Sequence, residues 1–470
     1  MKQILQNDWP FIILLILLSV FYIWGIKRIP FHPDEATQLY MSSDFDALFS
    51  QPSSLAWRSS QEDNPKQRYR ELDAPITKYL LGLGRSIAGY DAHTTDWDWR
   101  KSWEENILAG AYPDSNLLSV GRLSITLLLP LSLIFTYFIG VRIHGRGMGL
   151  TSVILLGTHA VVLLHGRRAM AEGPLLLGVT LATWSLLHVQ ESPWLTGLGM
   201  AFAFNAKQSA LALVPVAILA IIWLPKKMRK TLKKAPSSNK GILRTAVLQR
   251  IVNDLLKFLL VFLLITFLLN PIHWRQPFKS ISASVIARQK LLDQQIRDMK
   301  SIAPDEYFES PIRRALMMIA NIYIGPAEHS LVKNLEPTID DVNNYIAIPG
   351  HNLFRGTVWG GVCLILTLFG LCLAMRKILM TKVSMSREII ILLIATMFQL
   401  VALIVVVPLS LIRYTVPVIP FVCLWIAFGI VNLLSIRSDG NLLINTQEGD
   451  YSYRIAQDDQ CAKKQRRSKW

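Results

Sequence analysis

The chain has 470 residues, of which 51% are hydrophobic and 17% charged, and its formal net charge at pH 7 is +16. This composition excludes a disordered chain, because disordered segments carry too few apolar residues to form a core. The apolar residues stand in uninterrupted blocks, and several blocks reach the roughly 20 residues that a membrane-spanning helix needs. The sequence therefore predicts an all-α, polytopic membrane protein.

About ten membrane spans are predicted. The first, Trp9–Ile26, is interpreted as a retained anchor, because a signal peptide would have a shorter apolar core and a small-residue cleavage site. The 31 residues of Trp194–Leu224 would extend roughly 46 Å as one helix, too far for a single pass, so two short passes are expected, Trp194–Phe204 and Ser209–Leu224. The remaining spans are Leu117–Gly140, Met148–His165, Gly173–Gln190, Asp254–Asn270, Thr357–Met375, Ile389–Val407 and Leu411–Leu434.

Basic residues in the short loops set the expected orientation. The stretch Lys226–Arg250 has nine Lys and Arg residues and no acidic residue, and the linker around Arg142 and Arg146 is also basic. Short basic loops mark the cytoplasmic side of a membrane. Both termini are then cytoplasmic, and two long loops, residues 27–116 and 271–355, are exported.

The domain organisation follows from this orientation. Residues 1–434 are expected to form one transmembrane domain, followed by a basic cytoplasmic tail, residues 435–470, which either contacts anionic lipid or floats free. The positive charge indicates topology and not nucleic-acid binding, because no folded basic module with interleaved aromatic residues is found.

Two polar motifs lie in the first exported loop. Asp34 and Glu35 follow Pro33, which suits the first turn of a helix, where carboxylates are favoured. The pair is interpreted either as first-turn charges alone or as a site where an ionised base accepts a proton from a hydroxyl group. Asp73 is predicted to be the N-cap of a second helix that contains Lys78, and both helices are expected to lie along the membrane surface.

Several cations are predicted at the outer ends of spans. Arg167 and Arg168 run against the positive-inside tendency, so they bind either a phosphate group or lipid headgroups. A lysine near hydrocarbon, such as Lys207, either faces a polar cavity or snorkels to the surface. Arg413 and Tyr414 open the last span, where an interfacial anchor is the plainer interpretation.

The sequence also excludes some chemistry. It contains no Gly-x-x-x-x-Gly-Lys-Ser/Thr loop, which argues against ATP hydrolysis, and no His-Glu-x-x-His zinc motif. The four cysteines form no Cys-x-x-Cys pair, and none lies in an exported loop.

Taken in order, these segments resemble the GT-C membrane glycosyltransferases. They are most similar to glycosyltransferase family 39, which includes protein O-mannosyltransferases and lipid A aminoarabinose transferases. The resemblance is carried by five segments: Asp34-Glu35, Asp73–Lys78, Arg168–Glu172, Lys207 and Arg413–Pro417. Of these, Asp73–Lys78 lacks the His and one Pro of the family's His-Pro-Pro-x-x-Lys element.

The resemblance implies a GT-C fold and transfer of one sugar from a polyprenyl-phosphate donor to a lipid, glycan or protein acceptor, with inversion. The site would face the outside of the cytoplasmic membrane, or the lumen of an endomembrane. A non-enzymatic flippase or transporter of lipid-linked saccharides is the alternative, and a polymerase or ligase that uses a larger lipid-linked oligosaccharide is a second enzymatic alternative.

The resemblance also implies residue roles. Asp34 would be the general base, and Glu35 or Asp73 would orient the acceptor. No cofactor is required, and a divalent metal, if one is used, would be held by Asp34 and Glu35. The donor and its leaving phosphate would be bound by a further set: Lys78, Arg167, Arg168, Glu172, Lys207, Arg413 and Tyr414.

Overall fold

The computed structural model describes residues 8–61, 64–223, 236–302, 304, 307–328, 337–380, 387–407, 409 and 411–435. In these residues all regular elements are helices, and the strand-like pairing is limited to one isolated bridge between Tyr307 and Leu409. The predicted all-α fold class is confirmed. The predicted basic tail after Ser435, and residues 224–235 of the predicted inner loop, lie outside the described residues.

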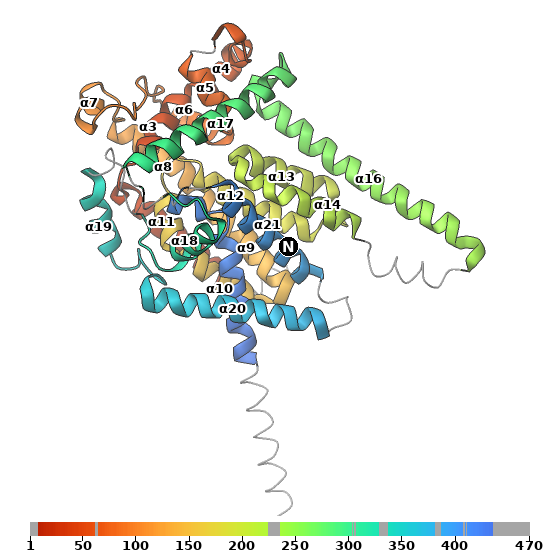
Figure 1. Cartoon of the computed structure of the whole chain (residues 1–470). Coiled ribbons are helices and arrows are strands. Elements are labelled where there is room, and N and C mark those ends of the chain that lie inside the picture. Colours follow the sequence, from red (N-terminus) through yellow and green to blue (C-terminus); the bar gives the residue numbers. More distant parts are fainter. Residues whose placement is uncertain are drawn as a thin grey trace, which may run out of the picture.

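The first long loop, which is predicted to be exported, folds into a helical cap, drawn in orange and red in Figure 1. A long helix of the second loop, α17 (Pro277–Ile302), crosses this cap and packs against α5. The cap consists of α3 (Pro33–Met41), α4 (Ser43–Ser50), α5 (Pro65–Leu72), α6 (Ile76–Ile87) and α7 (Trp103–Leu108).

The apolar helices form the body of the molecule below the cap (Figure 1). They are α2 (Trp9–Trp24), α8 (Ser115–Thr126), α9 (Leu128–His144), α10 (Arg146–Gly157), α11 (Ala160–His165), α12 (Glu172–Leu187), α13 (Pro193–Ala206), α14 (Val214–Ile222), α16 (Ser237–Leu269), α20 (Gly356–Met380), α21 (Arg387–Val406) and the helix Ile419–Ser435. Two helices of the second loop, α18 (Pro311–Tyr323) and α19 (Ile339–Ala347), lie beside this body.

Four of the described helical stretches are long and apolar enough to cross a membrane: Ser115–His144, Lys240–Leu269, Gly356–Met380 and Arg387–Val406. Five further apolar helices are shorter, among them Trp9–Trp24 and Glu172–Leu187. The membrane character is therefore confirmed, whereas the number of ten spans stays a prediction.

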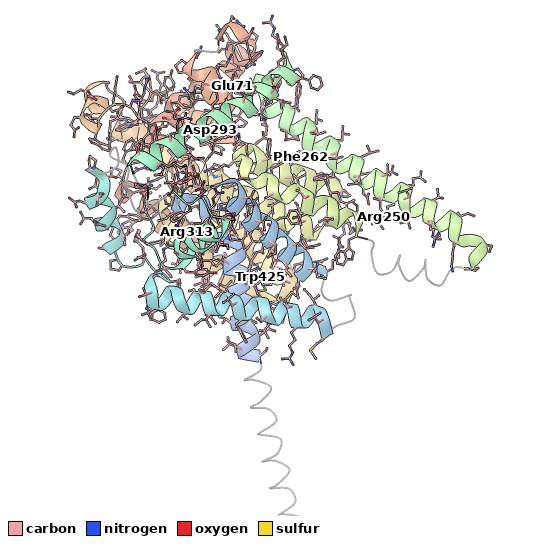
Figure 2. The ribbon with its side chains drawn as sticks, viewed as in Figure 1. Glu71, Arg250, Phe262, Asp293, Arg313 and Trp425 are labelled. Atoms are coloured by element: carbon pink, nitrogen blue, oxygen red, sulfur yellow. The ribbon has the colours of Figure 1, made fainter. Side chains whose placement is uncertain are left out.

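Helix α16 projects from the body, and most of its apolar side chains are exposed (Figure 2). Leu256, Leu260 and Leu263 are all at least 59% exposed, whereas Phe262 is buried where α16 packs against α13. A helix with one packed face and an exposed apolar face is typical of contact with lipid. Trp425, in contrast, is completely buried in the core of the body.

A close helix pair, α12 and α13, fixes the geometry of the site. Gly178 on α12 lies so near Ala203 on α13 that a Cβ atom at the glycine would stand 2.6 Å from the Ala203 Cα atom. The two helices are consecutive and antiparallel, so the beginning of α12 lies beside the end of α13. This pairing brings Glu172 and Lys207 together.

The predicted break within Trp194–Leu224 is confirmed. Helix α13 ends at Ala206, and Lys207 is extended, with φ −161° and ψ 133°. A short 3₁₀ segment, Gln208–Leu213, then leads into α14. Lys207 therefore lies at the gap between two helices and not on the face of one.

Candidate active site

The cap and the body meet at the first turn of α3, where the predicted helix start is confirmed. His32 is the N-cap: its Nδ1 atom accepts a hydrogen bond from the Asp34 N–H at 3.1 Å. The Glu35 Oε2 atom accepts one from the His32 N–H, also at 3.1 Å, which completes a capping box. Burial lowers the pKa of His32 to about 4, so its ring is neutral at pH 7.

Asp34 forms an ion pair with Arg413, which reaches it from the 3₁₀ segment Ile412–Thr415. The same guanidinium Nη1 atom lies 3.5 Å from the His32 Nε2 atom. Burial by itself would raise the pKa of Asp34, but the charge of Arg413 and its hydrogen bond to the carboxylate contribute to lowering it below its ordinary value. The Asp34 and Arg413 side chains are 32% and 16% exposed, so this carboxylate is ionised and partly accessible.

Glu35 lies in a different environment, although it is the next residue. Its two oxygen atoms each accept a hydrogen bond from Arg122 at 2.8 Å, and Oε1 also accepts one from the Ala169 N–H at 2.9 Å. The side chain is completely buried. Burial raises the pKa of Glu35, and the Arg122 ion pair outweighs burial and lowers it. Glu35 thus ties α3 to α8 and to the segment after α11, and its partner Arg122 also donates to the Ile29 carbonyl at 2.8 Å.

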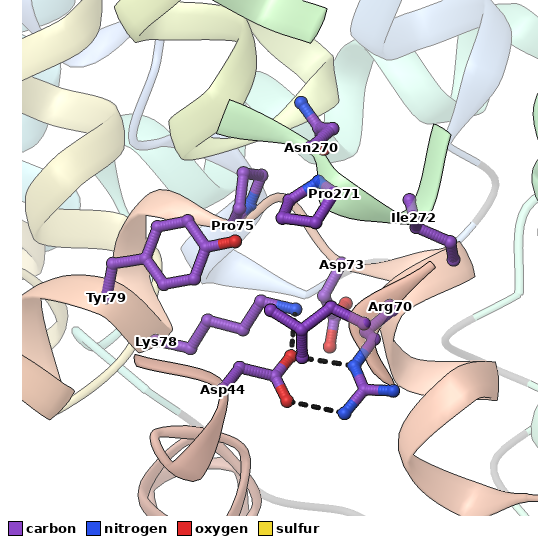
Figure 3. A pocket seen from close by; sticks show the side chains of 10 residues that line it. Asp44, Arg70, Asp73, Pro75, Lys78, Tyr79, Asn270, Pro271 and Ile272 are labelled. Atoms are coloured by element: carbon purple, nitrogen blue, oxygen red, sulfur yellow. Dashed lines mark hydrogen bonds and ion pairs between the residues drawn. The ribbon is translucent and has the colours of Figure 1, made fainter. Parts of the chain in front are cut away.

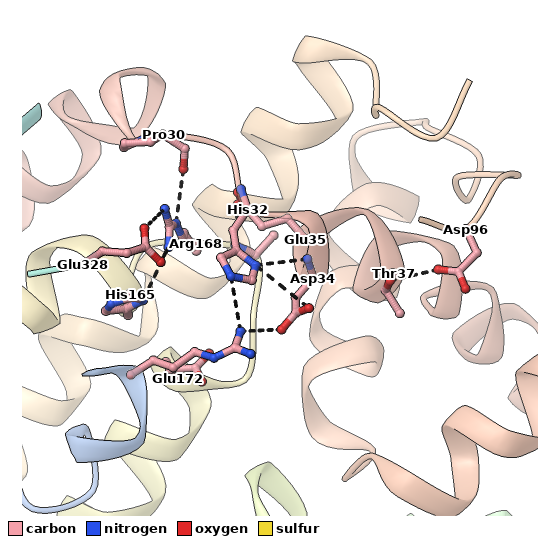
Figure 4. A network of polar contacts seen from close by, with 12 residues as sticks. Pro30, His32, Asp34, Glu35, Thr37, Asp96, His165, Arg168, Glu172 and Glu328 are labelled. Atoms are coloured by element: carbon pink, nitrogen blue, oxygen red, sulfur yellow. Dashed lines mark hydrogen bonds and ion pairs between the residues drawn. The ribbon is translucent and has the colours of Figure 1, made fainter. Parts of the chain in front are cut away.

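The two predicted arginines, Arg167 and Arg168, are also completely buried. Arg168 donates to both oxygens of Glu328, at 2.8 and 2.6 Å, and to the Pro30 carbonyl at 3.1 Å (Figure 4). Arg167 donates to the Leu163 carbonyl and to the Tyr345 hydroxyl. The structure therefore gives both guanidinium groups protein partners, and their predicted contact with phosphate stays a prediction.

Lys207 and Glu172 form the second polar pair beside Asp34. The Lys207 Nζ atom lies 2.6 Å from Glu172 Oε1, and the lysine side chain is 24% exposed. The other carboxylate oxygen, Glu172 Oε2, is buried without a hydrogen-bond partner among the described residues. The Lys207 Nζ atom also lies 5.3 Å from the centre of the Tyr414 ring, so the predicted residues Glu172, Lys207 and Tyr414 are brought together.

Asp73 and Lys78 line a neighbouring pocket between the cap and the segment after α16 (Figure 3). The Lys78 Nζ atom lies 2.8 Å from Asp44 Oδ2, and Arg70 binds the same carboxylate at 2.7 and 2.9 Å. Burial raises the pKa of Asp73, and the charges of Arg288 and Lys78 offset only part of this effect.

The prediction that Asp73 is an N-cap is wrong. Helix α5 continues to Leu72, so Asp73 is the C-cap of α5, and Pro75 takes the N-cap position of α6. The predicted helix over residues 76–87 is present all the same. Its start was misplaced because the sequence pattern did not indicate how far α5 continues.

Three important residues were missed from the sequence: Arg122, Glu328 and Arg288. A signal existed for Arg122, because a charged residue inside the predicted span Leu117–Gly140 requires a buried partner. Glu328 and Arg288 lie in the long second loop, where no pattern distinguishes them from other polar residues.

The carboxylates of Asp34 and Glu35 take separate arginine partners. Within the described part of the chain, no group of three or more His, Cys, Asp or Glu residues is arranged to hold a metal ion. The proposed metal ligands therefore stay a prediction.

Comparison with known families gives a match over residues 64–274. The matching family is described as "Dolichyl-phosphate-mannose-protein mannosyltransferase". This match supports, over these residues, the resemblance to glycosyltransferase family 39 that the sequence motifs indicate. The matched region contains Asp73, Lys78, Arg168, Glu172 and Lys207. No curated protein matches the chain significantly.

Solved structures of membrane glycosyltransferases are also similar to the chain. ArnT from Cupriavidus metallidurans bound to undecaprenyl phosphate is 14% identical, with a TM-score of 0.49, over 94% of this chain and 63% of that chain. The Archaeoglobus fulgidus oligosaccharyltransferase in the apo form is 11% identical, with a TM-score of 0.49, over 94% of this chain and 52% of that chain. The present chain thus spans about half to two thirds of the length of these structures.

Proposed function

We propose that this protein transfers a sugar from a polyprenyl-phosphate donor to an acceptor hydroxyl on the extracytoplasmic or luminal side of its membrane, with inversion. The observation that carries the proposal is the ionised, partly exposed carboxylate of Asp34, held beside Arg413 and close to Lys207. The family match supports the reaction class.

Asp34 acts as the general base in this proposal. The acceptor oxygen forms a bond to the anomeric carbon while the bond from that carbon to the phosphate oxygen breaks. The acceptor proton passes to the Asp34 carboxylate, and the bonding electron pair leaves with the polyprenyl phosphate. Arg413 holds the carboxylate ionised and oriented, so that it can accept the proton without a prior change of protonation state.

The leaving phosphate requires fixed positive charge as the reaction proceeds. Among the cations predicted from the sequence, Lys207 and Arg413 keep the most exposed surface, 24% and 16% of their side chains, whereas Arg167 and Arg168 are sealed. Lys207 is therefore assigned the main contact with the phosphate, and Arg413 a supporting one. A charge placed in this way contributes about 10²–10³ to the rate constant.

The position expected for the donor lipid and the predicted orientation in the membrane are both consistent with this proposed site. The exposed apolar helices of the body provide a surface for a polyprenyl chain, and Asp34 lies in the loop predicted to be exported. The basic loop predicted between α14 and α16 assigns the opposite side to the cytoplasm.

The test uses purified protein in nanodiscs with radiolabelled dolichyl-phosphate mannose and undecaprenyl-phosphate sugars. Free polyprenyl phosphate should be released, slowly with water and faster with the acceptor, and Asp34→Asn should abolish the release. Asp91→Asn, which changes an exposed aspartate of the same loop, is the matched control and should keep full activity.

The same protein, reconstituted in vesicles, distinguishes a transferase from a flippase. If no donor is cleaved by the wild-type protein and labelled lipid crosses the bilayer instead, the protein is a flippase and the transferase proposal is wrong.

A further inference from the structure

We propose that Arg288 on α17 is a positioning residue of the site, which holds the segment of Asp73 and the segment of Lys207 in register with each other. The inference rests on the proposed function and adds a residue from the second exported loop to it. The sequence motifs gave no indication of this residue.

Helix α17 packs against α5 and is anchored at its beginning. The Ser280 side chain is completely buried and is joined to His273 by a hydrogen bond of 2.8 Å. One and two turns further on, the half-buried residues are the small side chains Ala283, Ser284 and Ala287. Figure 2 shows the result, with α17 (labelled at Asp293) beside α5 (labelled at Glu71).

Three segments meet at one carbonyl group below this helix. The Arg288 Nη2 atom donates to the Leu72 carbonyl and also to Gln208 Oε1, at 3.1 Å. The Gln208 Nε2 atom donates to the same Leu72 carbonyl at 3.0 Å. A closed set of hydrogen bonds therefore joins α17, the end of α5 and the start of the 3₁₀ segment after α13.

The residues on either side of this junction belong to the proposed site. Leu72 immediately precedes Asp73, and Gln208 immediately follows Lys207. Because Lys207 is extended and lies between two helices, its segment has no continuous helix to fix its direction. The contacts through Gln208 and the ion pair with Glu172 supply that restraint.

The charge of Arg288 also acts on Asp73. It is the largest of the charges that lower the pKa of that carboxyl against the effect of burial, ahead of Lys78 on α6 and Lys207. Asp34 on α3 acts in the opposite direction and raises it. Arg288 therefore favours an ionised Asp73, the state in which this side chain can accept a hydrogen bond from an acceptor hydroxyl.

The experiment compares Arg288→Gln with Gln208→Ala and with Arg297→Gln, a control that removes an exposed arginine from the same helix. Hydrogen–deuterium exchange in nanodiscs measures residues 277–302 and 72–76 without reference to activity. The kinetic readouts are kcat, the KM for the lipid-linked donor, and the pH dependence of kcat/KM.

We expect Arg288→Gln to speed exchange in both segments and to lower kcat about ten- to a hundredfold, with the donor KM changed less than twofold. Its activity should also be lost at a higher pH on the acid side, because the pKa of Asp73 rises when the arginine is removed. Gln208→Ala should lower kcat without moving the pH profile, and Arg297→Gln should leave every readout unchanged.

Two results overturn the inference. Equal exchange rates in Arg288→Gln and Arg297→Gln show that Arg288 holds nothing in place. Faster exchange with an unchanged kcat and pH profile shows a structural role alone. If the wild-type protein cleaves no donor, the proposed function fails by itself, and the exchange experiment still decides whether Arg288 joins the two segments.

Discussion

The two acidic residues that open α3 are neighbours in sequence, yet they belong to two different regions of the molecule. Asp34 points to the partly open region formed with Arg413, Lys207 and Glu172. Glu35 points into a sealed region, where Arg122 binds both of its oxygens, and the buried pair of Arg168 and Glu328 lies nearby.

The difference shows what exposure does to an ion pair. In the sealed region the Glu35–Arg122 and Arg168–Glu328 pairs are buried or nearly so, and removal of one partner leaves an uncompensated charge with little or no access to water. In the partly open region Asp34, Arg413 and Lys207 keep access to solvent, so a substrate can exchange with a protein partner. The sealed region therefore holds the cap on the body, and the open region is where chemistry is proposed.

The largest expected effect is on activity, and it comes from replacing Asp34, the carboxylate of the partly open region. We expect Asp34→Asn to lower the rate of donor cleavage about 10³-fold, because the general base is lost. The thermal midpoint should change little, because the group is partly exposed. Both are measured on protein in nanodiscs, and appreciable activity in Asp34→Asn would disprove the assignment of the base.

Removing one partner of the Glu35–Arg122 ion pair in the sealed region should mainly lower the stability of the protein. We expect Arg122→Met to lower the free energy of unfolding by about 3–5 kcal/mol, because Glu35 is left buried and unpaired. Arg142→Met, which removes an arginine that is 42% exposed in its ion pairs, should cost less than about 1 kcal/mol. Denaturant unfolding in detergent measures the free energy of unfolding of both variants. An equal loss of stability in the two variants would contradict the contrast between a buried and an exposed ion pair.

Lys207→Met tests the Lys207–Glu172 ion pair of the partly open region. The rate of donor cleavage should fall about 10²-fold through loss of the charge beside the leaving phosphate. Because Glu172 is then left without its partner, stability should fall as well. The double variant Lys207→Met/Glu172→Gln should recover stability but not activity, and recovery of both would assign Lys207 a structural role only.

The smallest expected effect is a shift of the pH profile. Arg413 contributes to lowering the pKa of Asp34, so this base should stay ionised in the wild-type protein to below the ordinary aspartate value of about 3.9. In Arg413→Gln the pKa of Asp34 rises, so activity should be lost at a higher pH as the base becomes protonated. A profile of kcat/KM against pH measures the shift, and an unchanged acid side in this variant argues against Asp34 as the titrating group.

Much of the local structure was predictable because it depends on neighbouring residues. Pro33 with two following acids predicted the start of α3, and the length of Trp194–Leu224 predicted the break at Lys207. The position of Asp73 was mispredicted, because two short helices follow each other closely and the boundary between them depends on how α5 and α6 pack.

The sequence by itself determined an all-helical membrane protein and the set of polar residues at the ends of its helices, because apolar block length and local motifs encode these. Only the tertiary structure decided which of those residues are open. The partners that seal Glu35, Arg167 and Arg168 come from segments up to 178 positions away, such as the one that carries Tyr345. No local pattern specifies such a contact, since it forms only when distant helices pack together.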